Sequence, residues 1–363
     1  MLLLQISVFL IGLFIVAWTL FSAVRSIVLP RGMPDSLTRT VFILTWQVFR
    51  FRLRWTSSYL QQDRIAAYFA PFALLMLLPT WYTLVLVGFT GMYWSLGAGS
   101  AADAFALSGS SMLTLGFRSS TNLVIDVFMF IQATIGLLLI AMLIAYLPTM
   151  YAAFSRREEA VNLLEVRAGN PPSAVEMISR FNRIHGLDRL SEFWPRWETW
   201  FANLEESHTS LPGLVFFRSS RPEHSWITAA GAVLDGAALT LSTVDIPMDS
   251  GAALCIRAGY LALRNICEYL NLSYSADPTY PFQPISITRQ EYDAAVTLLE
   301  KEGVPIKPDR EQAWLDFAGW RVNYDATLLS LAGITLPPNA PWSSDRARDF
   351  TPGIFPWSNR KNN

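Results

Sequence analysis

The chain has 363 residues, of which 52% are hydrophobic and only 16% are charged. In soluble domains about a quarter of the residues are charged, so the composition indicates a membrane protein. The length leaves room for one soluble domain besides the membrane part. The formal net charge of −1 provides no bulk positive charge for nucleic acid, and no nucleic-acid partner is expected.

Residues 1–24 contain no charge and are rich in Leu, Ile, Phe and Val. The run is long enough to cross about 30 Å of hydrocarbon as a helix. It lacks the basic start and small-residue cleavage site of a secretory signal. We therefore predict a first transmembrane helix over 1–24, with a retained signal-anchor as the alternative.

Residues 25–64 form a basic loop, in which only Asp35 and Asp63 oppose the arginines. The positive-inside rule places this loop in the cytoplasm. Its aromatic, apolar and basic segment 40–55 predicts a helix lying in the membrane interface. A fourth span is disfavoured, because too few uncharged residues precede Arg50 to cross a bilayer. The arginines of the loop are Arg25, Arg31, Arg39, Arg50, Arg52, Arg54 and Arg64.

Two further hydrophobic runs predict an outer helix over 65–93 and an inner helix over 123–154. No charge lies between Arg64 and Asp103, or between Asp126 and Arg156. The inner helix is followed directly by Arg156 and Arg157, a second cytoplasmic marker. These markers predict a multi-pass membrane protein with the N-terminus outside and the C-terminal region inside.

Residues 158–335 have the composition of a soluble, mostly helical cytoplasmic domain. A capping box at Thr288–Glu291 predicts the start of one helix, whereas 214–217 is strand-like. The prolines of 336–363 predict an irregular or extended tail. The predicted fold class is thus an all-α membrane protein with three transmembrane helices per chain and a cytoplasmic helical domain.

The loop between the second and third spans holds a short uncharged segment. Ser100–Asp103 has the form of a capping box, which predicts a short helix over 101–113. A polar, glycine-bearing loop at membrane depth must be buried in protein or line a watery cavity. The carbonyl end of the short helix would favour a cation, and Gly116 would supply unusual backbone angles. The predicted cation ligands are the backbone carbonyls of Thr114, Leu115, Gly116 and Phe117.

Thr114-Leu-Gly-Phe117, set between two predicted spans, resembles the Thr-Val-Gly-Tyr filter of the potassium-channel pore-domain family. The resemblance covers roughly residues 66–157 in the order outer helix, re-entrant pore helix (101–113), filter (114–118) and inner helix. Further matching positions are Phe105, Ser108 and Ser111 before the filter, and Gly136 and Pro148 in the inner helix.

The resemblance implies a homotetramer in the lipid bilayer of the cell (inner) membrane that passes a monovalent cation, K⁺ above all, with no other cofactor. It also implies a hinge at Gly136 and a gate near Pro148, both regulated by the cytoplasmic domain. From the residues alone, close helix packing at Gly136 and a plain kink at Pro148 are the alternatives. A re-entrant hairpin that only packs the spans together is the alternative for residues 95–122.

The chain departs from the family after the filter, where Gly-Asp is replaced by Arg118-Ser119. Four arginines would ring the outer mouth and depress cation entry unless neutralised. Asp126 is the expected partner. This departure supports a second interpretation, a non-conducting membrane scaffold or sensor that acts through its cytoplasmic domain.

Signals for other chemistry are weak. Cys255 and Cys267 lack further ligands and are predicted to be buried thiols in a reducing compartment. The three histidines have no partner at metal-ligand spacing, so no metal is expected beyond the permeant cation. No nucleophile turn or Gly-rich phosphate loop is present, so no enzyme is predicted, and the cytoplasmic ligand or partner is unknown. The histidines are His185, His208 and His224.

Overall fold

The structure is a computed structural model that describes residues 1–29, 35–56 and 58–346. Arg31 of the predicted basic loop and residues 347–363 of the predicted tail lie outside these ranges. The described residues form helices and loops without a strand, apart from an isolated bridge between Val244 and Ile306. The predicted all-helical fold is therefore confirmed for this part of the chain.

The chain divides into two compact units. The first comprises Met1–Trp55 and Tyr68–Ala152, and the second comprises the described parts of Thr56–Ala67 and Ala153–Asn363. The residues predicted as one basic loop, 25–64, are thus shared between the units: helix α2 (Ser36–Leu53) belongs to the first, and α3 (Tyr59–Ala67) to the second.

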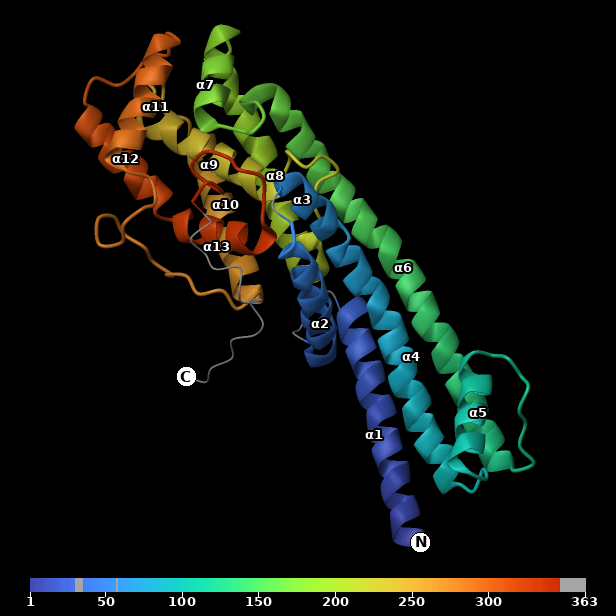
Figure 1. Ribbon diagram of the computed structural model, residues 1–363. Helices are drawn as coiled ribbons and strands as arrows, with labels where there is room; N and C mark the ends of the chain where they lie inside the picture. The colour runs from blue at the N-terminus through green and yellow to red at the C-terminus, as the bar shows by residue number, and fades with distance from the viewer. Residues whose placement is uncertain (30–34, 57, 347–363) are drawn as a thin grey trace. The chain divides into compact units, whose positions relative to one another are not determined.

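Three helical segments are long and apolar enough to cross a membrane, which confirms the predicted number of candidate spans. They contain α1 (Leu2–Ile27), α4 (Phe69–Ser95) and α6 (Leu123–Ala168), all labelled in Figure 1. Pro71 occupies the first turn of α4, where a missing N–H costs no intrahelical hydrogen bond. The third helix runs on without a break from its apolar part into the charged segment after Arg156.

Helices α1 and α4 pack through two glycines. A Cβ on Gly12 would lie 2.4 Å from the carbonyl oxygen of Gly88, and one on Gly88 would lie 2.9 Å from the carbonyl oxygen of Gly12. The helix backbones therefore touch at this point, as small residues permit in membrane helices. On α1 the buried stripe continues through Val16, Thr19 and Ala23, which recur at helical spacing.

Helix α2 begins at the cap Asp35, whose carboxylate accepts hydrogen bonds from the Thr38 N–H (2.8 Å) and the Ser22 hydroxyl (2.5 Å). Its aromatic side chains meet Phe69 of α4; Trp46 is the nearest, with ring centroids 5.0 Å apart. The segment predicted to lie in the membrane interface is thus a helix packed on the start of α4.

The second unit is built around α9 (Trp226–Ser242), of which almost every residue is buried. Four helices contact it: α7 (Ala174–Arg183), α10 (Ser250–Tyr269), α12 (Arg310–Arg321) and α13 (Asp325–Thr335). Two more helices pack on these, α8 (Leu190–Ser210) against α10 and α11 (Arg289–Lys301) against α7. The unit also includes α3 and the part of α6 from Ala153 on. The capping box that opens α11 is present as predicted.

Both cysteines lie on α10 and are buried as free thiols. Desolvation raises the pKa of both Cys255 and Cys267. Buried, protonated thiols are poor nucleophiles and poor metal ligands, so their role in this unit is packing.

The strand predicted at 214–217 is wrong: Pro212–Phe216 is a 3₁₀ helix, η2. Pro212 begins it with a fixed φ. Arg157 of α6 donates hydrogen bonds to the carbonyls of Leu214 (3.0 Å) and Phe217 (2.7 Å). A buried arginine thus satisfies backbone groups that a neighbouring strand would otherwise have to pair.

Arg321 is fully buried at the end of α12 and is bound from three sides. Its guanidinium contacts Asp235 of α9 at 2.5 Å and Asp325 of α13 at 2.7 Å. It also donates to the Trp342 carbonyl at 2.7 Å. The described start of the predicted tail, 336–346, is therefore packed against the helices rather than extended.

Because of the close approach at Gly12, we expect Gly12→Ala to lower the free energy of unfolding by about 1–3 kcal/mol, since the backbones must separate. The measurement is thermal unfolding of the detergent-solubilised protein. Gly319→Ala on α12 is the control, because a Cβ there meets no atom within 4 Å. It should be neutral or stabilising by up to about 1 kcal/mol. A Gly12→Ala protein as stable as wild type would contradict the packing.

Removing only the arginine of the buried cluster leaves the Asp235 carboxylate buried without its cation. We expect Arg321→Met to destabilise the protein by about 3–5 kcal/mol, measured by denaturant unfolding. Arg310→Met on the same helix removes an exposed pair with Glu300 and should cost at most about 1 kcal/mol. Equal effects of the two substitutions would show that the buried cluster adds nothing.

Candidate functional site

Helix α5 (Ala101–Met112) stands between α4 and α6 in the chain and starts at the predicted capping box. The Ser100 hydroxyl accepts the Asp103 N–H at 3.2 Å, and the Asp103 carboxylate accepts the Ser100 N–H at 3.1 Å. These two reciprocal bonds are local in sequence, which is why the helix start could be predicted.

A chain of buried hydrogen bonds ties α5 to both neighbouring helices. The Tyr93 hydroxyl of α4 donates to Gln132 Oε1 of α6 at 2.8 Å. The Gln132 amide nitrogen donates to the Ser108 hydroxyl of α5 at 2.7 Å, and that hydroxyl donates to the Leu86 carbonyl of α4 at 2.9 Å. One amide thus connects three helices.

Gln132 and Tyr93 were not predicted as site residues. Gln132 is the one amide side chain in a stretch that carries no charge between Asp126 and Arg156. Such a residue is costly in hydrocarbon unless it has a partner. Its presence within the span could therefore have predicted a hydrogen bond to another helix. The identity of its partners depends on how the three helices pack, and no local pattern contains that information.

Two further contacts hold α5 against α6. The Ser111 hydroxyl donates to the Met129 carbonyl at 2.7 Å. A Cβ on Gly136 would lie 2.6 Å from the Met112 carbonyl oxygen, so a larger residue would push the end of α5 away. Close packing therefore explains this glycine; α6 is a continuous helix through Gly136 and Pro148, and a hinge or gate at these residues stays a prediction.

The end of α5 is a Schellman motif. The Leu115 N–H donates to the Ser110 carbonyl at 2.8 Å, and the Thr114 N–H donates to the Ser111 carbonyl at 3.0 Å. This geometry requires a left-handed residue after the helix, normally glycine. Here it is Thr114, with φ 54°. A β-branched residue in this region is strained, which makes position 114 unusual on backbone grounds alone.

After this turn the chain runs back along α5, and its N–H groups face Ser110. Besides Leu115, the Gly116 N–H donates to the Ser110 carbonyl (3.5 Å), and the Arg118 N–H donates to the Ser110 hydroxyl (3.1 Å). In a trans peptide the C=O of one residue points opposite to the N–H of the next. The carbonyls of Thr114, Leu115 and Phe117 therefore point away from α5.

No donor among the described residues reaches the carbonyl oxygens of Thr114–Phe117. The loop from Leu113 to Ser119 is exposed along its whole length, and Figure 1 shows it as an open connection between α5 and α6. Leu115 and Phe117 are each 61% exposed. A single chain thus presents a row of unpaired carbonyls flanked by uncovered apolar side chains.

The acid that pairs with Arg118 is Asp103, at 3.6 Å, and not the expected Asp126. The return of the chain along α5 brings Arg118 to the helix start, whereas Asp126 lies in the first turn of α6. Hydrogen bonds from the Ser100 side chain and backbone lower the pKa of Asp103, and Arg118 adds to this effect. Asp103 therefore remains an anion opposite Arg118 at neutral pH.

In the part of the chain that the structure describes, no group of three His, Cys, Asp or Glu side chains is placed to hold a metal ion. Comparison with protein-family models, curated proteins and solved structures found no match for this chain.

We expect Gln132→Met to lower stability by about 1–2 kcal/mol, because the Tyr93 and Ser108 hydroxyls both lose a partner and bonds between membrane helices average about 0.6 kcal/mol. The measurement is thermal unfolding in detergent. Thr134→Val on the same helix is the control, since Thr134 is exposed and bonds only to the Phe130 carbonyl of its own helix.

A double substitution separates the network from ordinary packing. Tyr93→Phe should destabilise the wild-type protein but have little further effect in the Gln132→Met background. Additive effects of the two substitutions would show that Tyr93 does not act through Gln132.

Proposed function

We propose that four copies of this chain assemble in a membrane as a potassium-channel-like pore, with residues 114–117 as its filter. The observation that carries the proposal is the direction of the peptide groups. The N–H groups of Thr114, Leu115, Gly116 and Arg118 donate to α5, and the carbonyls of Thr114, Leu115 and Phe117 face the other way, without a donor among the described residues. Rings of such carbonyls can replace the hydration shell of a cation.

The exposed apolar residues near the loop support an assembly. Phe105, Leu113, Leu115 and Phe117 are each more than half exposed in the single chain. Irregular backbone at membrane depth is tolerated only when it is buried in protein or lines a watery cavity. Neighbouring copies of α5 and its loop would cover these side chains and leave the carbonyls around a central axis.

The ion pair between Arg118 and Asp103 would reduce the positive charge at the outer mouth of the proposed pore. Four unpaired arginines would oppose cation entry, but each arginine has a carboxylate 3.6 Å away in its own chain. A neutral pair restores part of the attraction for cations at the entrance. In this proposal the permeant ion is a monovalent cation, K⁺ above all.

The charge distribution supports a cytoplasmic second unit and an external α5 loop. In this arrangement the second unit would regulate the pore through α6, which belongs to both units. A second candidate function is a non-conducting scaffold or sensor. It is favoured by one observation, the half-exposed arginine directly after the filter.

The proposal is tested first by mass and then by flux. The purified protein should have the mass of a tetramer, because a monomer or dimer has no ring of carbonyls. Reconstituted into liposomes, it should pass thallium or potassium. Arg118→Gly should increase the flux severalfold, because it leaves the Asp103 carboxylates unpaired at the proposed entrance, where they attract cations. Arg257→Gly, an exposed position on α10 of the second unit, is the control.

Absence of flux through both wild type and Arg118→Gly, with the tetramer intact, would favour the scaffold and end the channel proposal. If the protein is not a tetramer, it can form neither a filter of four carbonyl sets nor a ring of arginines, and the channel proposal is wrong. Unchanged flux in Arg118→Gly would mean that Arg118 does not line the entrance.

A further inference from the structure

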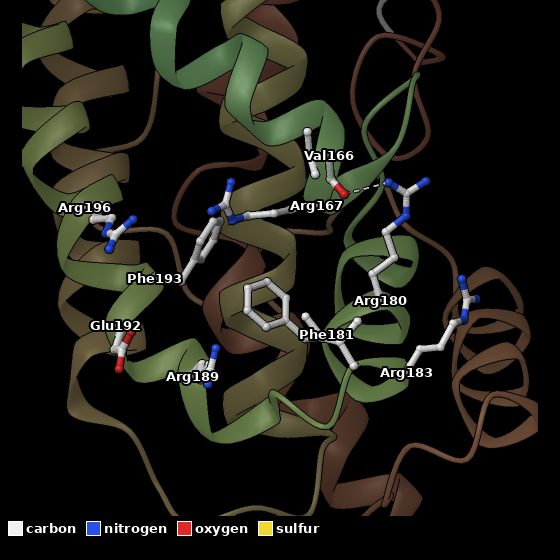
Figure 2. Close-up of a pocket in the computed structure, with 10 residues that line it drawn as sticks. Val166, Arg167, Arg180, Phe181, Arg183, Arg189, Glu192, Phe193 and Arg196 are labelled. Carbon is white, nitrogen blue, oxygen red and sulfur yellow. Dashed lines mark hydrogen bonds between the residues drawn. The ribbon is translucent and has the colours of Figure 1, made fainter.

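A cavity of about 510 Å³ lies in the second unit between the end of α6, α7 and the start of α8. Ligand pockets for small molecules have volumes of about 300–1,000 Å³, so its size suits a small molecule. Its charged lining is strongly one-sided, with a single carboxylate, that of Glu192, against five arginines (Figure 2). The arginines are Arg167, Arg180, Arg183, Arg189 and Arg196.

Two of these arginines are already paired with carboxylates, and their bonds hold the walls of the cavity together. Arg180 pairs with Glu176 at 2.5 Å and donates to the carbonyls of Glu165 and Val166 at the end of α6. Arg183 pairs at 2.9 Å with Glu302, the residue that directly follows α11. These bonds fix α7 against its neighbours and account for the charge of both residues.

The other three arginines, Arg167, Arg189 and Arg196, have no carboxylate within ion-pair distance among the described residues. Arg167 donates one hydrogen bond to the Leu163 carbonyl (3.0 Å), which leaves the rest of its guanidinium open. With Glu192 as the opposing charge, the cavity keeps an excess of two positive charges. Guanidinium groups bind phosphate oxygens in bidentate geometry.

The floor of the cavity is aromatic. Phe181 of α7 and Phe193 of α8 meet edge to face with ring centroids 5.7 Å apart, and Ile184 and Val166 add apolar surface at the rim. Figure 2 shows Arg167 pointing from the end of α6 toward Phe193. An inorganic anion would use the arginines alone, whereas a ligand with a planar ring would use the floor as well.

The place of the cavity along α6 favours a dissolved ligand over a lipid headgroup. The apolar run of α6 ends at Phe154. At a rise of 1.5 Å per residue, Arg167 lies about 20 Å further along the helix. The polar headgroup region adds only about 5–8 Å beyond the hydrocarbon on each side. For a helix crossing near the membrane normal, the cavity therefore lies beyond the headgroups.

We propose that this cavity binds a soluble phosphorylated compound that carries a planar ring, the chemistry of a nucleotide. The phosphates would lie among Arg167, Arg189 and Arg196, and the ring over Phe181 and Phe193. The proposal does not depend on ion conduction, since it rests on the second unit alone.

The test is a fluorescence titration of the full-length protein in detergent with the N-methylanthraniloyl derivative of ATP, followed by displacement with ATP. We expect saturable binding that Arg189→Gln and Arg196→Gln each weaken about tenfold, because each removes a charge-assisted bond to phosphate. Arg257→Gln, an exposed arginine of α10 outside the cavity, should bind like wild type. Circular dichroism checks that each variant is folded.

Three displacement arms separate the sources of binding. Adenosine should displace weakly for want of phosphates, and inorganic phosphate weakly for want of a ring. Displacement by phosphate as effective as by ATP overturns the role of the aromatic floor. Displacement by phosphatidylglycerol nanodiscs but not by ATP overturns the soluble ligand. No saturable binding, or equal binding by the cavity variants and wild type, overturns the site itself.

Discussion

The amide of Gln132 is the contact on which the candidate site depends. In hydrocarbon, apolar contact between helices has little driving force, so hydrogen bonds and close packing decide how helices associate. This one side chain accepts from Tyr93 of α4 and donates to Ser108 of α5. The position of the short helix is thereby set by directional bonds, which specify its depth and rotation more sharply than apolar packing does.

Once α5 is in place, hydrogen bonds to its last turn restrict the backbone conformation of the following loop. The N–H groups of Leu115, Gly116 and Arg118 converge on Ser110, and trans peptide geometry turns the carbonyls that precede them outward. The strain of a left-handed Thr114 is tolerated because two hydrogen bonds of the helix end require that conformation. The same return of the chain carries Arg118 to Asp103, so their ion pair follows from the path of the turn.

In the second unit, buried polar groups are paired through charged side chains, not through a neutral amide such as that of Gln132. Arg321 is surrounded by Asp235, Asp325 and a backbone carbonyl, and Arg157 caps carbonyls near η2. These arginines have their partners inside the unit. Three of the five arginines around the cavity at the start of α8, Arg167, Arg189 and Arg196, have no carboxylate partner among the described residues. This contrast is what suggests the cavity as a site for an external anion.

Much of the framework was decided by the sequence alone. The three hydrophobic runs predict spans because a helix must be about 20 apolar residues long to cross a bilayer, and the boxes at Ser100 and Thr288 predict helix starts because their bonds are local. The partners of Gln132, the pairing of Arg118 with Asp103 in place of Asp126, and the 3₁₀ turn where a strand was expected were decided only by the tertiary structure. Each depends on groups from separate elements, or on the path of a turn, and neither periodicity nor spacing encodes that proximity.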